Sequence, residues 1–210
     1  MMLKNRHLFI LILFISFFSC DLDIEYVEVE DPEKIKLDSI NQISKDAVLI
    51  DNYIDSVDLK NVITIDNGIK YSITKKGNDI FPENNNILSF NINGYYMNDT
   101  IFSIFDTNSK LVAESYDIYI NTNEYAPIAF TYTTDGRYFG LNSFHGYLTL
   151  IDHLKKSIGK IMPFVDENGK FTIILPSGTA YGKDGNINFP VIPGNSVLIF
   201  EIHLLKIRKK

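Results

Sequence analysis

An alternating apolar run near the C-terminus is the feature that most restricts the fold of this chain. The run covers residues 196–207, and its apolar residues at every second position are Leu198, Phe200, Ile202 and Leu204. Because successive side chains of a strand point to opposite faces of a sheet, these four share one buried face. Before the run stands Leu175-Pro-Ser-Gly-Thr-Ala-Tyr-Gly182, which predicts an ordered loop that presents Tyr181. The C-terminal part therefore predicts a long closing strand with a structured loop beside it.

Hydrophobic periodicity predicts the remaining elements. Strand patterns cover residues 68–74, 87–96, 127–134 and 170–175, and residues 116–120 predict an added strand or flap. Helical spacing connects Tyr147, Leu150, Ile151, Leu154 and Ile158, and Gly159 follows as the expected C-terminal cap. Asp166-Glu-Asn-Gly169 predicts a hairpin turn. Several antiparallel strands with one short helix define an α+β domain.

The loop and the closing strand together resemble the C-terminal half of the FKBP-type peptidyl-prolyl cis-trans isomerases. The resemblance covers about residues 61–210 and is most specific from Gly169 onward. It implies an FKBP-like curved antiparallel β-sheet wrapped around one short helix. It also implies that Tyr181 donates a hydrogen bond to a bound peptide and that the backbone N–H of Ile192 holds a ligand carbonyl. Val191 would lie beside Ile192, and Phe200 would form a wall of the pocket.

Two further segments match the family's pocket. Residues 94–102 resemble the strand and turn that lead to a wall phenylalanine, which makes Phe102 that wall residue. Residues 142–147 resemble the segment that enters the helix, which implies Phe144 on the wall and Tyr147 on the floor. An ungapped match then puts Ser103 where the family carries an aspartate.

Other positions depart from the family's pattern. The chain has no Trp, the usual floor residue of these isomerases. Phe105-Asp106 would supply the family's Phe-Asp pair only after a two-residue insertion. Residues 103–126 form an inserted segment, which either caps the cleft or leaves it open.

The chemistry that the resemblance implies needs no nucleophile, metal or cofactor. Rotation about an X–Pro bond breaks amide conjugation, against a barrier of ~18–20 kcal/mol. In the twisted state the nitrogen lone pair is localised and the carbonyl is less polarised, so water favours the planar ground state. An apolar aromatic enclosure removes that advantage, and each ~1.4 kcal/mol of preferential transition-state binding is about tenfold in rate.

No other constellation in the sequence predicts a different chemistry. The four histidines, His7, His145, His153 and His203, lack metal-ligand spacing, so we expect no metal. Ser177 and Ser196 have no partner base within sequence reach. The net charge of −6 provides no basic face, which argues against nucleic acid as a partner.

The N-terminus predicts export. Lys4, Arg6 and His7 precede an apolar run over residues 8–18, which is typical of a secretory signal and too short for a membrane span. Phe17-Phe18-Ser19-Cys20 resembles a bacterial lipobox, in which Cys20, the only cysteine, carries the lipid. A plain cleaved signal with an incidental Cys is the alternative. We therefore expect residues 1–19 to be a lipoprotein signal peptide and the protein to be anchored in the bacterial cell envelope.

Residues 20–60 form the connection to the domain. Their first part, residues 21–31, is acidic and predicts a solvated tether, although it also resembles surface-export signals of Bacteroidetes lipoproteins. Beyond it a helical stripe, which predicts an amphipathic helix packed on the core, consists of Ile43, Ala47, Ile50, Ile54 and Val57.

Two functions follow from the resemblance. The first is a prolyl isomerase that binds proline-containing segments and assists the folding of exported proteins. The second is a catalytically silent FKBP-like lipoprotein that binds or scaffolds envelope proteins, which the missing Trp favours. Both assign the FKBP-like domain to residues 61–210.

Overall fold

The computed structural model describes residues 31–133, 152–187 and 191–209. Seven strands, three α-helices and three 3₁₀-helices lie within these ranges. In chain order they are α1 (Pro32–Ser56), β1 (Ile63–Thr64), η1 (Asp66–Gly68), β2 (Lys70–Lys75), β3 (Ile87–Met97), β4 (Phe102–Thr107), α2 (Lys110–Ser115), β5 (Ile128–Thr131), α3 (Asp152–Ile161), η3 (Met162–Phe164), β6 (Lys170–Leu175), η4 (Ser177–Thr179) and β7 (Val197–Arg208).

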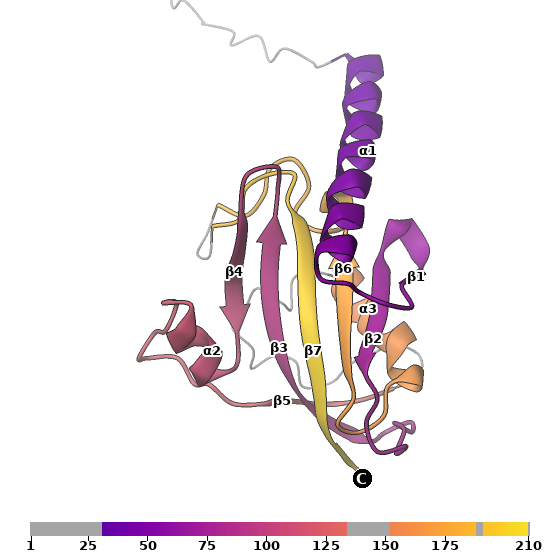
Figure 1. The fold of residues 1–210 in the computed structure, drawn as a ribbon, viewed down its shortest axis with the longest axis vertical. Helices are drawn as coiled ribbons and strands as arrows, with labels where there is room; N and C mark the ends of the chain where they lie inside the picture. Colours follow the sequence, from indigo (N-terminus) through magenta and orange to yellow (C-terminus); the bar gives the residue numbers. More distant parts are fainter. Residues whose placement is uncertain (1–30, 134–151, 188–190, 210) are drawn as a thin grey trace, which may run out of the picture.

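The strands form one curved antiparallel sheet, as Figure 1 shows. Their order is β1-β2-β6-β7-β3-β4, and β5 pairs with the first half of β3. The closing strand β7 is central, because β6 pairs along one side of it and β3 along the other. The predicted α+β class and the predicted closing strand are confirmed.

The inner face of the sheet carries the main core. Every alternate residue of β7 from Leu198 to Leu204 is buried there, together with Leu88, Phe90 and Ile92 of β3. Leu154, Ile158 and Ile161 of α3 pack into the same cluster. The sheet therefore buries its inner face against α3, as the helical spacing predicts.

Helix α1 covers part of the outer face (Figure 1). Asp31 is its N-cap and accepts a hydrogen bond from the Glu33 N–H at 3.0 Å, while Pro32 opens the first turn. Ile50 packs in a second core cluster with residues of the sheet's outer face, namely Tyr95, Ile104, Ile174, Val197 and Ile199.

The predicted packing of the helical stripe is right only for Ile50 and Ile54 in the second half of α1, because Ala47 and Val57 are exposed. Ile50 is buried, but Ile43 is 65 % exposed. Ile43 lies in the first half of the helix, which projects beyond the end of the sheet (Figure 1). The stripe has no neighbour there, because the sheet ends before the helix does.

Residues 116–120, predicted to be an added strand or flap, form no strand. After β4 the chain forms the short helix α2, whose N-cap Ser109 accepts a hydrogen bond from the Val112 N–H at 3.4 Å. Asp117 then adopts a φ of 57°, and Tyr119 stacks on Tyr125 with ring centroids 5.3 Å apart. This segment therefore makes a local contact between two rings and does not pair with a strand.

Two predicted boundaries around α3 also need correction. Gly159 is not a cap, because the helix continues to Ile161 and passes into η3, with Ile161 and Met162 fully buried. The turn at residues 166–169 forms, with the Gly169 N–H donating to the Asp166 carbonyl at 2.8 Å. It is not a hairpin turn, because β6 pairs with β2 and β7, and what precedes the turn is η3.

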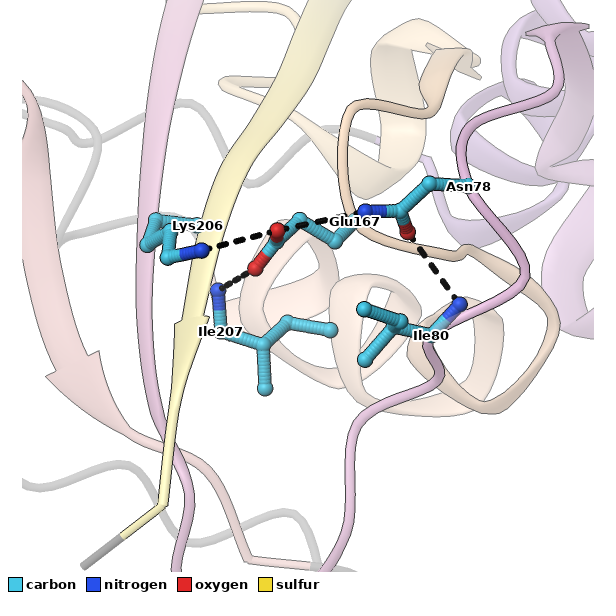
Figure 2. A network of polar contacts seen from close by, with 5 residues as sticks. All are labelled: Asn78, Ile80, Glu167, Lys206 and Ile207. Atoms are coloured by element: carbon cyan, nitrogen blue, oxygen red, sulfur yellow. Dashed lines mark hydrogen bonds and ion pairs between the residues drawn. The ribbon is translucent and has the colours of Figure 1, made fainter.

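Two adjacent carboxylates fasten the lower end of the sheet. Asp166 accepts hydrogen bonds from the N–H groups of Gly77 and Asp79 at 2.7 and 2.8 Å. Glu167 accepts from the Ile207 N–H at 2.7 Å, from Lys206 at 3.0 Å and from the Asn78 amide at 3.2 Å (Figure 2). The loop before β3 is thereby tied to the end of β7.

Within the described ranges, no helix has both the length and the apolar character needed to span a bilayer.

Candidate binding site on the inner face

The loop that presents Tyr181 is built around the backbone of Ser177. The Ser177 carbonyl accepts hydrogen bonds from the N–H groups of Ala180 and Gly182, at 3.0 and 2.9 Å. Gly182 has a φ of 61°, which favours glycine. Tyr181, between these two residues, is half-buried and packs against the main core. The predicted ordered loop with a presented tyrosine is therefore present.

The chain after Tyr181 folds back on itself. Asn186 and Ile192 form an isolated antiparallel bridge, and the Asn195 N–H donates to the Gly182 carbonyl at 2.7 Å. Gly185, at the turn, has a φ of 67°, and a Cβ there would lie only 2.2 Å from the Ile192 carbonyl oxygen. Only glycine fits at this position.

This bridge changes the role of Ile192. Its side chain is buried in the main core, but its N–H donates to the Asn186 carbonyl at 2.9 Å. The predicted use of that N–H for a ligand carbonyl is therefore incompatible with this conformation. Ile192 contributes apolar surface, while its neighbour Val191 is 64 % exposed.

Phe200 lies at the centre of the inner face. Its ring is fully buried and meets the ring of Phe105 edge-to-face, with centroids 5.9 Å apart. Ile192 and Tyr181 pack in the same cluster. The inner face thus brings together two phenylalanines, the tyrosine loop and Ile192.

Alternation along β4 directs Phe105 to the inner face, because the residue before it, Ile104, belongs to the outer-face cluster. Gly94 pairs with Asp106 and Tyr95 pairs with Ile104, so Phe105 is an extra residue in β4 and forms a β-bulge. The bulge leaves Phe105 and the buried Asp106 together opposite Gly94. The inward phenylalanine of β4 is therefore Phe105 and not Phe102.

The prediction that Phe102 forms a wall of this pocket is wrong. Phe102 is 52 % exposed and lies on the outer face, where its ring stacks on Tyr95 at 5.3 Å and on Tyr53 of α1 at 5.9 Å. Its position follows from the register, because Met97, its partner in β3, also faces outward. Ser103, the next residue, is half-buried and pairs with Tyr96, which packs against the inner core.

Three predicted site residues lie outside the described ranges. They are Cys20, Phe144 and Tyr147.

A groove of about 350 Å³ lies on the outer face, away from the Tyr181 loop. It is lined by Tyr53, Val57 and Leu59 from α1 and the turn after it, and by outward-facing residues of the sheet including Glu201 and His203. Glu201 accepts a hydrogen bond from the Tyr95 hydroxyl at 3.1 Å. Burial, and then the negative charge of Glu201, raise the pKa of Tyr53 to about 12 and raise the pKa of Tyr95 as well.

Sequence reasoning missed one residue of the site's support, Asp46 of α1. Its carboxylate accepts hydrogen bonds from both the N–H and the hydroxyl of Ser177, at 2.8 and 2.7 Å. Ser177 has no partner nearby in sequence because its partner is 131 positions away. The one local signal was an acidic residue within an otherwise apolar helical stripe.

In the part of the chain that the structure describes, no group of three or more His, Cys, Asp or Glu side chains is arranged to hold a metal ion.

Comparison with known proteins gives similarity at the level of solved structures. No family model matches the chain, and no curated protein matches its sequence. FkpA from Escherichia coli is 20 % identical, with a TM-score of 0.46 over 84 % of this chain, which spans 63 % of that protein. A peptidyl-prolyl cis-trans isomerase from Pseudomonas syringae is 17 % identical, with a TM-score of 0.44 over 86 % of this chain and 99 % of that one. The N-terminal domain of FKBP42 from Arabidopsis thaliana is 16 % identical, with a TM-score of 0.45 over 71 % and 94 % of the two chains.

These values state what the chain is similar to. Similarity at this level carries no inference about activity, so function has to be argued from the residues of the site.

Proposed function

We propose that the protein is a peptidyl-prolyl cis-trans isomerase that binds proline-containing polypeptide segments on the inner face of its sheet. The observation that supports this most is the edge-to-face contact between Phe105 of β4 and Phe200 of β7 on the inner face. Ile192 and the Tyr181 loop join them in one cluster. This set combines apolar ring surface with a phenol that can donate a hydrogen bond, and the pattern of the Tyr181 loop and β7 is the one that resembles FKBP-type isomerases.

Such a site would act by removing the prolyl amide from water and by holding the peptide backbone next to it. An apolar ring enclosure stabilises a twisted prolyl amide better than water does, because the twisted amide is less polar than the planar one. The Tyr181 hydroxyl would brace the backbone next to the proline. The Ile192 N–H is engaged by the Asn186 carbonyl in this conformation.

A second candidate function is binding of proline-containing segments without catalysis. The engagement of the Ile192 N–H favours it, as does the close packing of Phe105 and Phe200, which are 6 % and 0 % exposed. A site that binds the planar prolyl amide as tightly as the twisted one binds the peptide without accelerating rotation.

Two measurements on one preparation separate these functions. A protease-coupled assay with an Ala-Leu-Pro-Phe anilide reports isomerisation, and titration of a proline-containing peptide into labelled protein reports binding. Catalysis above the uncatalysed rate supports the isomerase. Binding without catalysis supports the silent module, and folded protein that shows neither contradicts both.

We also propose that Cys20 is lipidated and anchors the protein in the bacterial cell envelope, at the outer membrane and facing either side of it. This proposal is supported by the lipobox-like residues 17–20 and the apolar run before them. Metabolic labelling with radioactive palmitate tests it. Label in the wild type that disappears in Cys20→Ser is expected, and equal label in both would contradict it.

A further inference from the structure

The N-terminal helix contains a buried carboxylate that also binds outside the helix. Asp46 lies in the middle of α1 and is 3 % exposed. The described ranges contain no Lys, Arg or His side chain that forms an ion pair with it. A charge buried without a counter-ion is destabilising unless hydrogen bonds satisfy it. Three donors satisfy Asp46, namely the Gln42 amide at 2.7 Å and the two groups of Ser177.

Two of those donors belong to the residue that organises the tyrosine loop. The N–H and hydroxyl of Ser177 both donate to Oδ2 of Asp46, at 2.8 and 2.7 Å. The carbonyl of the same residue accepts from Ala180 and Gly182, which flank Tyr181. A continuous path of short hydrogen bonds therefore connects α1 to the backbone on either side of Tyr181.

The position of Asp46 along the helix adds to the significance of this path. Residues 31–45 of α1 are exposed, apart from the half-buried Gln42. Asp46 is therefore the first buried residue at the point where the projecting half of the helix reaches the domain. Apolar packing at Ile50 already holds the second half against the sheet. Directional hydrogen bonds to one oxygen add what apolar packing does not supply, a fixed position for the Ser177 backbone.

We propose that Asp46 is a positioning residue for Tyr181, so that α1 is part of the binding site and not only a spacer. This rests on the proposed function for its catalytic consequence, but the coupling between α1 and the loop is independent of it. Displacement of α1 from the sheet would release Ser177 and allow Tyr181 to move.

The test uses three variants and one matched control in the full-length protein. Asp46→Leu removes both acceptor oxygens, Asp46→Asn keeps one side-chain oxygen, and Ser177→Ala removes one donor. The control is Glu167→Ala, which removes another buried carboxylate at the opposite end of the sheet. Like Asp46, Glu167 accepts several hydrogen bonds. All four are expected to lower the melting temperature.

Two readouts that do not need activity report on the loop. Hydrogen exchange of a peptide covering residues 176–187 reports the Ala180 and Gly182 N–H groups. A 3-fluorotyrosine placed at position 181 reports the surroundings of the ring. We expect faster exchange and a shifted fluorine resonance in Asp46→Leu and Ser177→Ala, a smaller effect in Asp46→Asn, and neither change in Glu167→Ala.

Catalysis is measured alongside these readouts. If the wild type is active, Asp46→Leu should lower kcat/KM roughly tenfold or more, as expected for a misplaced positioning group. If the wild type is inactive, the proposed isomerase is contradicted, and exchange and fluorine shift alone decide the coupling. Two results would overturn the coupling between α1 and the Tyr181 loop. One is exchange and fluorine resonance that stay at wild-type values in Asp46→Leu and Ser177→Ala, and the other is an equal change in Glu167→Ala. Should Asp46→Leu not fold, Asp46→Asn and Ser177→Ala decide in the same way.

Discussion

The ring of Phe105 lies directly over the backbone of Gly94. A Cβ added at Gly94 would be 2.7 Å from Cζ of Phe105 and little over 3 Å from its Cε atoms, at 3.1 and 3.2 Å. Gly94 lies opposite the bulge that Phe105 and Asp106 form, and the Phe105 ring in turn meets Phe200. The missing side chain at residue 94 is therefore what allows an aromatic pair on the inner face.

Gly94→Ala should destabilise the protein, because the Phe105 ring cannot retreat without losing its contact with Phe200. Overpacking of this kind amounts to about 1–3 kcal/mol of unfolding free energy. Urea denaturation followed by circular dichroism measures it. Gly178→Ala is the control, since a Cβ there has no atom within 4 Å, and its stability should stay within about 0.5 kcal/mol of wild type. Equal stabilities of the two variants would show that the ring is not held as described.

Asn108 anchors the inserted segment to the sheet. Its side chain accepts from the Ile92 N–H at 2.8 Å and donates to the carbonyls of Phe90 and Ala126 at 3.1 and 2.9 Å. Asn108→Ala leaves these buried backbone groups unsatisfied, which should lower the unfolding free energy by roughly 1–3 kcal/mol.

Limited proteolysis of Asn108→Ala measures how firmly the inserted segment itself is held. Cleavage within residues 110–126 should become faster, because the Ala126 end of the segment is released. The exposed Asn121→Ala in the same segment should leave the cleavage rate unchanged. Similar cleavage of both variants would contradict an anchoring role for Asn108.

The sequence predicted the sheet well for a physical reason. Burial of the inner face imposes a period of two, and β3 from Leu88 to Ile92 and β7 from Leu198 to Leu204 follow it, although Ile199 is also buried on the outer face. It failed at residues 116–120, where a similar alternation occurs but the segment forms no strand. Periodicity identifies a face, while pairing depends on long-range geometry.

The site was harder to predict because two of its determinants are non-local. The pairing of β4 with β3 sets Phe102 opposite the outward-facing Met97 and leaves Phe105 on the inner face, and this register depends on the partner strand. The partner of Ser177 is on α1, far away in sequence. In contrast, the Tyr181 loop is set by a local run of residues around Ser177 and Gly182, and its form could be predicted.

Phe102 and Phe200, which the sequence predicted to form walls of one pocket, should respond differently to truncation. Phe200→Ala opens a cavity in the main core and should cost about 3–5 kcal/mol of stability, whereas the half-exposed Phe102→Ala should cost much less. Peptide binding should weaken in a Phe200→Leu variant, which keeps most of the volume, and stay unchanged in Phe102→Ala. Weakened binding in Phe102→Ala would place the site on the outer face.

Stability should depend on acid through Glu167. The hydrogen bond from the Ile207 N–H, opposed in part by burial and assisted by Lys206, holds the pKa of this carboxyl below its ordinary value of 4.5. A lowered folded-state pKa means that its contribution is fully present above the ordinary value and is lost as pH falls through the folded-state value.

Glu167→Gln should therefore be less stable than wild type at pH 7, by roughly 1–3 kcal/mol, with a difference that shrinks below pH ~4. Thermal unfolding across pH 2–7 measures the difference. Glu114→Gln, which removes an exposed carboxylate 3.7 Å from Lys110, should show little difference at any pH. A Glu167→Gln difference that stays constant with pH would mean that the charge is not responsible.

The decisive measurement is the cis–trans exchange rate of an Ala-Pro peptide, followed by NMR exchange spectroscopy with catalytic amounts of protein. We predict exchange above the uncatalysed rate with wild type and with Tyr53→Phe, which alters only the outer groove. With Tyr181→Ala and Phe200→Leu the acceleration should fall about tenfold or more. Wild-type protein that is folded and leaves the exchange rate unchanged, or a Tyr181→Ala variant as active as wild type, would contradict catalysis on the inner face.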